Sequence, residues 1–200
     1  MGKIRYNVAT SLDGFIASPD GSTNWIIDDK CIDFDALYAQ FSVFLMGRKT
    51  YEVLLHHGNP LKGRKRESIV VVSTTLSADD NPEITVLSDG VVEFAQSLKS
   101  TTERDIWLMG GGDLATQLLA AGLVDTIEVG IMPVVIGEGI PMVTGSKMGN
   151  GGYKLEVERL ERLESGILLV NYNVVQGRET DTAQSTPPSS QMIKEKEQET

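Results

Sequence analysis

Three groups of glycine, basic and hydroxyl residues each follow a short apolar run. They are Gly47-Arg48-Lys49-Thr50, Ser73-Thr74-Thr75 and Gly110-Gly111-Gly112, the last continued by Asp113 and Leu114. Backbone N–H groups in glycine turns and at helix N-termini bind phosphate oxygens, and arginine, lysine and hydroxyl side chains add charge and hydrogen bonds. Together the three groups indicate a site for a dinucleotide that carries a pyrophosphate and a further phosphate.

Each group has a simpler explanation when it is taken alone. Gly110, Gly112 and Ala115 fit the G-x-G-x-x-[GA] spacing of dinucleotide-binding turns, but strand–glycine–helix turns without a ligand are common. Basic and hydroxyl residues are also frequent at ordinary strand ends. All three groups together are stronger evidence, because open α/β sheets bind ligands outside the carboxyl ends of their strands.

Hydrophobic patterning predicts the elements that hold these groups. Short apolar runs predict strands at 43–46, 69–72, 84–87 and 106–109, and apolar residues at alternate positions predict strands at 3–9 and 124–131. Apolar residues at helical spacing predict helices after Asp28 or Asp29, after Gly47, over 91–99 and over 114–119. Long strands at 153–163 and 167–175 predict a hairpin. The expected fold is α/β and three-layered, with a mostly parallel central sheet, helices on both faces and a C-terminal antiparallel β-hairpin.

A standard Rossmann domain does not fit this order of elements. Its glycine motif would follow the first strand, with an acidic residue about 20 positions later. In this chain the first strand is followed by Ser11-Leu12-Asp13-Gly14, and the glycine turn comes in mid-chain. We therefore reject the Rossmann interpretation.

Composition narrows the class of partner. The chain has 200 residues, a formal net charge of −10 and a sequence pI of about 4.7, which argues against nucleic-acid and membrane partners. Cys31 is the only cysteine, so neither an internal disulfide nor a cysteine metal site is expected, and no metal is predicted. No apolar run is long enough to span a bilayer, and a cytoplasmic location is expected. Residues 177–200 are rich in Thr, Ser, Gln, Pro and Glu, which predicts a disordered polar tail.

Four stretches, in order along the chain, resemble a known superfamily. Residues 46–52, Met-Gly-Arg-Lys-Thr-Tyr-Glu, and the Met-Gly-Gly-Gly of 109–112 resemble the two glycine signatures of the dihydrofolate reductase superfamily. Residues 11–17, Ser-Leu-Asp-Gly-Phe-Ile-Ala, and 132–139, Met-Pro-Val-Val-Ile-Gly-Glu-Gly, are more similar to its riboflavin-biosynthesis branch, the RibD C-terminal domain type. The resemblance extends from about Lys3 to Val175, which implies one reductase-type domain over residues 1–176.

This resemblance implies an NADPH-dependent reductase. It implies hydride transfer to a small pterin- or pyrimidine-like heterocycle, with chemistry of the 5-amino-6-(5-phosphoribosylamino)uracil reductase type, in a homodimer. Arg48, Lys49 and Thr50 would hold the adenosine phosphates with Ser73, Thr74 and Thr75. The pyrophosphate would lie against 110–114, and the segment from Thr10 to Ala17 would line the nicotinamide.

The carboxylates leave alternatives open. Asp13 and Asp29 are the candidate catalytic residues. For Asp13, however, ordering of its own loop ranks above contact with cofactor or substrate, and for Asp28 or Asp29 capping ranks above catalysis. His57-Gly58-Asn59-Pro60 and Arg64 only loosely resemble the substrate-phosphate segment of the riboflavin branch. A genuine dihydrofolate reductase and a non-catalytic nucleotide-binding protein with the same fold are therefore the alternatives.

Overall fold

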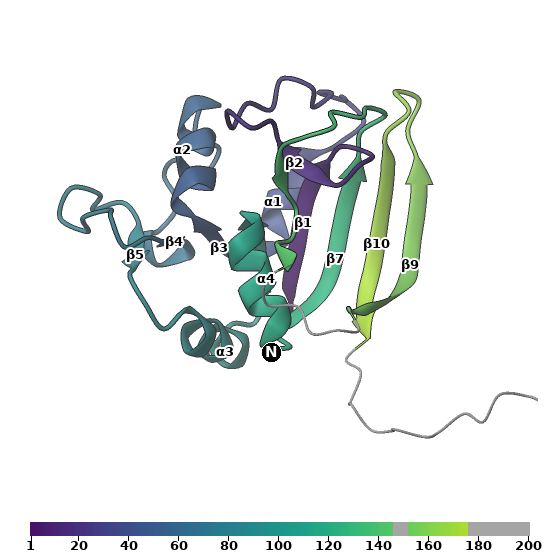
Figure 1. Cartoon of the computed structure of the whole chain (residues 1–200). Helices are drawn as coiled ribbons and strands as arrows, with labels where there is room; N and C mark the ends of the chain where they lie inside the picture. Colours follow the sequence, from purple (N-terminus) through teal and green to yellow (C-terminus); the bar gives the residue numbers. More distant parts are fainter. Residues whose placement is uncertain (146–151, 176–200) are drawn as a thin grey trace, which may run out of the picture.

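A computed structural model describes residues 1–145 and 152–175 (Figure 1). Its eight main strands are β1 Ile4–Thr10, β3 Phe41–Gly47, β4 Ile69–Val72, β5 Thr85–Leu87, β6 Asp105–Gly110, β7 Val124–Ile131, β9 Lys154–Arg162 and β10 Leu168–Val175. They form one sheet in the order β5-β4-β3-β6-β1-β7-β10-β9. The strands from β5 to β7 are parallel, and β10 runs antiparallel to both β7 and β9. The predicted sheet and its C-terminal hairpin are confirmed.

Helices cover both faces of the sheet, as predicted. They are α1 Phe34–Ala39, α2 Arg48–His56, α3 Val91–Thr101 and α4 Gly112–Ala120, and a short 3₁₀ helix, Arg66–Ser68, precedes β4. Successive residues of a strand point to opposite faces. Phe44 and Trp107 accordingly join the core beneath α1 and α2, whereas Leu45 and Leu108 join the core beneath α3 and α4.

The first helix begins later than the sequence pattern predicts. Asp33, and not Asp28 or Asp29, is its N-cap, because the Asp33 carboxylate accepts a hydrogen bond from the Ala36 N–H at 2.9 Å. The helix ends at Ala39, and Phe41, although at helical spacing from Phe34 and Leu37, is the first residue of β3. The acidic run before the helix offers several possible caps, so local pattern alone does not select one.

Two short strands lie in stretches for which the sequence analysis predicts neither a strand nor a helix. β2, Phe15–Ala17, pairs antiparallel with β8, Ile140–Pro141, in a separate two-stranded sheet. The pairing joins segments more than a hundred residues apart and leaves no local signal. The predicted disordered tail, 177–200, lies outside the described residues. Within 1–145 and 152–175, no helix is long and apolar enough to cross a bilayer.

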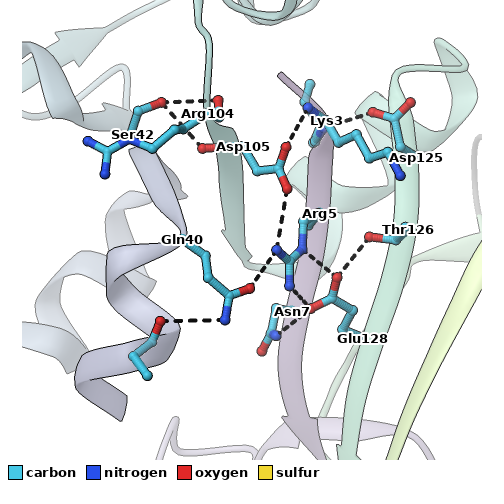
Figure 2. Close-up of polar contacts among 12 residues, drawn as sticks. Lys3, Arg5, Asn7, Gln40, Ser42, Arg104, Asp105, Asp125, Thr126 and Glu128 are labelled. Carbon is cyan, nitrogen blue, oxygen red and sulfur yellow. Dashed lines mark hydrogen bonds and ion pairs between the residues drawn. The ribbon is translucent and has the colours of Figure 1, made fainter. Parts of the chain in front are cut away.

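A buried ion pair joins β1 to β7 beneath α1 (Figure 2). Arg5 Nη2 donates to Glu128 Oε2 at 2.8 Å, and Thr126 Oγ1 contacts Glu128 Oε1 at 3.0 Å. Glu128 is only 6% exposed. Burial would raise the pKa of its carboxyl, but the hydrogen bonds and charge of Arg5, with hydrogen bonds from Asn7 and Thr126, outweigh burial and lower the pKa below its usual value. Glu128 is therefore a carboxylate near neutral pH.

The ion pair makes a pH-dependent contribution to stability. Replacing Glu128 with glutamine keeps the shape and removes the charge opposite Arg5, so E128Q should lower the free energy of unfolding near neutral pH by about 3 kcal/mol. A lowered folded-state pKa stabilises the fold above the unfolded value, and that contribution is lost as pH falls through the folded value. Urea unfolding from about pH 7 to about pH 3 should therefore show the two proteins converging in acid.

Glu156, which is exposed on β9, supplies the matched control. E156Q makes the same chemical change outside the ion pair and should leave the free energy of unfolding within about 0.5 kcal/mol of wild type. A deficit in E128Q that stays constant over the whole pH range would contradict the assignment.

Candidate functional site

A cleft of about 1040 Å³ lies at the carboxyl ends of β3, β4 and β6. It brings the three sequence groups together. The predicted cofactor residues that line it are Ala17, Gly47, Arg48, Lys49, Thr50, Ser73, Thr74, Thr75, Gly111, Gly112, Asp113 and Leu114. The volume is at the upper end of the range for ligand sites and suits two ligands side by side better than one small molecule.

Two helix N-termini meet in this cleft. α2 follows Gly47 and α4 follows Gly111, and neither glycine position supplies a side-chain cap. β3 and β6 are neighbours, with Met46 opposite Gly110, so the two helices start side by side. A Cβ on Gly47 would lie 3.7 Å from the backbone nitrogen of Gly111. Uncapped first-turn N–H groups and the positive ends of two helix dipoles therefore face the same space, which favours an anion.

The glycines of the turn have different physical roles. Gly110 has a φ of +106°, a conformation that disfavours side chains. A Cβ on Gly112 would lie 2.3 Å from the Pro141 carbonyl oxygen, so Gly112 lets the β2–β8 ribbon pack against α4. Gly111 has an ordinary φ of −78°, and the nearest atom to a Cβ there is Thr50 Oγ1 at 3.9 Å. Gly111 therefore tolerates a side chain, which would enter the cleft.

The cations and hydroxyls occupy the rim of the cleft. Arg48 Nη1 pairs with Glu52 Oε1 one helical turn later, and both side chains are more than a third exposed. Lys49, Thr74 and Thr75 are exposed. The Ser73 hydroxyl accepts hydrogen bonds from the backbone N–H groups of Thr75 and Leu76 at 3.1 and 3.0 Å. Ser73 therefore orders the turn that presents the two threonines.

The other half of the cleft lies between the sheet and the helices α1 and α2. Side chains of Trp107 and Met109 belong to the core beneath these helices. The remaining lining residues in this half come from β1, from the loop before α1, and from α1 and α2, and include Asn7, Ala9, Ile26, Phe34, Leu37, Val53 and His56. Apart from its few polar members this lining is apolar, which suits a flat ring. The sequence analysis did not single out these residues, although Asn7 is a polar residue in the middle of the first strand.

Two predicted cofactor residues are not in the lining of the cleft. Gly110, the last residue of β6, lies between Met109 and Gly111, which both line the cleft. Thr10 is 2% exposed, and its carbonyl oxygen accepts a hydrogen bond from the Met132 N–H at 2.7 Å. Thr10 lines a separate, mainly apolar cavity of about 400 Å³ with Leu12 and Tyr172.

The two candidate catalytic carboxylates are also outside the lining. Asp13 accepts hydrogen bonds from the Ile136 and Gly137 N–H groups at 3.3 and 2.8 Å, and the pKa of its carboxyl is lowered, first by the Ser11 hydroxyl and then by these N–H groups. Asp13 thus ties its own loop to 136–137, as the ordered-loop alternative predicts. Its catalytic role stays a prediction.

Asp29 lies beside a local turn. Its carboxylate accepts a hydrogen bond from the Cys31 N–H at 2.8 Å, and hydrogen bonds from Ser165 and Cys31 lower its pKa. A catalytic role for Asp29 also stays a prediction. In the described part of the chain, no group of three or more His, Cys, Asp or Glu residues is placed to hold a metal ion.

Comparison with known sequences shows which proteins share this pattern. Residues 2–169 match the family model described as the RibD C-terminal domain. The uncharacterized protein YyaP of Bacillus subtilis is 30% identical over 181 residues, which cover 86% of this chain and 94% of that protein.

Solved structures share the fold. A putative riboflavin biosynthesis protein from Shewanella sp. PV-4 superposes with a TM-score of 0.71 at 21% identity, covering 88% of this chain and all of that one. A Thermotoga maritima diaminohydroxyphosphoribosylaminopyrimidine deaminase/5-amino-6-(5-phosphoribosylamino)uracil reductase superposes with a TM-score of 0.61 at 16% identity, covering 87% of this chain but only 57% of that one. The match over residues 2–169 is consistent with the sheet order and with the glycine signatures. The chain therefore belongs to the RibD C-terminal domain family and has a dihydrofolate reductase-like fold.

Proposed function

We propose that this protein is an NADPH-dependent reductase that transfers a hydride to a small pterin- or pyrimidine-like heterocycle. The observation that carries the proposal is the meeting of two uncapped helix N-termini at Gly47 and Gly111 in one large cleft. Membership of the RibD C-terminal domain family, which takes its name from riboflavin biosynthesis proteins, supports the same reaction class.

The residues present fit a dinucleotide that carries a third phosphate. Gly111, Gly112 and Thr50 would hold the pyrophosphate, because backbone N–H groups and a hydroxyl are available there without an intervening side chain. Arg48 and Lys49, with Thr74 and Thr75, would hold the further phosphate at the rim. When bound, NADPH supplies the hydride, which leaves the protein the tasks of binding, orientation and exclusion of water.

The second half of the cleft would hold the substrate. Ile26, Phe34 and Leu37 form an apolar wall opposite the strands, and Trp107 lies in the sheet beneath. Such a lining removes water from a ring held between the wall and the sheet, and electrostatic interactions are stronger in the resulting low dielectric. The homodimer implied by the family resemblance is part of the proposal, and Val157 and Leu160, exposed on the outer strand β9, are available for such an interface.

A single side chain at Gly111 tests the cofactor site. Gly111→Asp should abolish NADPH binding, by about a hundredfold or more in Kd, because a carboxylate would face the pyrophosphate. Isothermal titration of NADPH into each variant measures the effect. Gly111→Ala is the matched control, since a Cβ fits at this position, and its affinity should stay within about threefold of wild type. Equal NADPH affinity in Gly111→Asp and wild type would refute the site.

Turnover tests the reaction class. Loss of NADPH absorbance should be seen with a pyrimidine or a pterin from a panel that includes 5-amino-6-(5-phosphoribosylamino)uracil and dihydrofolate, and Gly111→Asp should abolish it. Oxidation with dihydrofolate alone would favour the dihydrofolate reductase alternative. NADPH binding without oxidation by any member of the panel would favour a non-catalytic nucleotide-binding protein.

A further inference from the structure

Among the cleft-lining residues that belong to the eight-stranded sheet, Asn7 has the one polar side chain in the described part of the chain. The others in that sheet are Val8, Ala9, Gly47, Val72, Trp107 and Met109. The Trp107 indole N–H is not free for a ligand, because it donates to the Asn7 backbone carbonyl at 2.9 Å. Asn7 therefore supplies the polar side chain on the sheet side of this half of the cleft.

The orientation of the Asn7 amide is determined by its neighbour. Asn7 Nδ2 donates to Glu128 Oε2 at 2.8 Å, and the two residues lie opposite each other on β1 and β7. Glu128 is paired with Arg5, and its lowered pKa keeps it ionised near neutral pH, so it can only accept. The amide nitrogen must face Glu128, and Oδ1 must point away from it, as Figure 2 shows.

Asn7 Oδ1 is consequently a fixed acceptor. No residue in 1–145 or 152–175 donates a hydrogen bond to it. The backbone on either side is held in the sheet between β6 and β7, and the Trp107 indole holds the Asn7 carbonyl. An acceptor that is oriented before binding loses little conformational freedom when a ligand arrives, and it discriminates against ligands that leave it unpaired.

We propose that Asn7 is a specificity-determining residue, whose side-chain oxygen accepts a hydrogen bond from a ring N–H or exocyclic amino group of the substrate. This inference rests on the proposed function, since it places the heterocycle in the half-cleft beside Trp107. The substrate class becomes narrower: a flat heterocycle with an in-plane N–H donor, such as an aminopyrimidine or a pterin. Arg5 and Glu128 do not touch the ligand in this account and act by orienting Asn7.

Two probes of the same shape separate the hydrogen bond from ring packing. 2,4-Diaminopteridine carries exocyclic amino donors, and 2,4-dimethylpteridine replaces both by methyl groups. Wild-type protein, titrated with and without NADP⁺, should bind the diamino probe about tenfold more tightly than the dimethyl probe. Asn7→Leu, which keeps a side chain of similar size, should lose this difference and bind NADPH as wild type does.

Thr126→Val is the matched control. It also removes one hydrogen bond to the Glu128 carboxylate, but Thr126 is buried outside the cleft lining. It should therefore leave the affinities for both probes and for NADPH unchanged. If Asn7→Leu does not fold, as judged by circular dichroism, Asn7→Ala makes the same test, because it also removes the acceptor oxygen.

Three results would overturn the proposal: equal affinity of wild type and Asn7→Leu for the diamino probe, an equal loss in Thr126→Val, or no preference of wild type between the probes. A different result, the failure of wild type to bind NADPH, would refute the proposed function itself. If wild type binds NADPH but Asn7→Leu has the probe affinities of wild type, the reductase proposal stands and only the role of Asn7 is refuted.

Discussion

The parallel pairing of β3 with β6 determines where the cleft lies and which groups face it. Each strand is followed at once by a glycine and a helix, so pairing the strands places the starts of α2 and α4 beside each other. Parallel strands put their carboxyl ends at one edge, which is where this fold class binds ligands. The adjacent uncapped N-termini follow from this topology and from the absence of a side chain at Gly47 and Gly111.

The remaining elements close this site or support it. The β2–β8 ribbon packs against the glycine turn because Gly112 has no Cβ to keep the Pro141 backbone away. Within the ribbon, Gly139 likewise lets the chain before β8 approach the Ala17 carbonyl oxygen. α1 and α2 pack over one face of the sheet and form the outer wall of the cleft. Beneath α1, the Arg5–Glu128 ion pair joins β1 to β7. A buried ion pair is weak evidence for stability by itself, since desolvation offsets much of the attraction. Its value in this protein is geometric, because an ionised Glu128 allows Asn7 only one orientation.

Much of the fold could be predicted from the sequence because its signals are local. The run at 69–72 is continuously apolar, and in 124–131 the apolar residues Ile127, Val129 and Ile131 alternate with others. Both stretches are strands over those residues. The predicted start of α1 was wrong because several aspartates precede the helix and each could be its N-cap. β2 and β8 could not be predicted, because such short strands exist only through their pairing with each other.

The candidate site was also predictable only where its residues carry a local signal in the sequence. The glycine, basic and hydroxyl groups carry their signal in residue type and spacing, and they meet as expected. Asn7 carries no such signal, because its orientation depends on Glu128, which is 121 positions away in the chain. Asp13 and Asp29 were selected by position relative to family motifs, and the structure shows them bound to backbone N–H groups of turns and loops.

The central claim is that this cleft holds a dinucleotide with an extra phosphate. This claim can be tested by isothermal titration of the wild-type protein with NADPH and, in parallel, with NADH. The two ligands differ only in the phosphate assigned to Arg48, Lys49, Thr74 and Thr75. NADPH should bind tightly and NADH at least about tenfold more weakly, because NADH lacks the phosphate that makes the charge-assisted hydrogen bonds. Equal affinity for both ligands, or binding of neither, would contradict it.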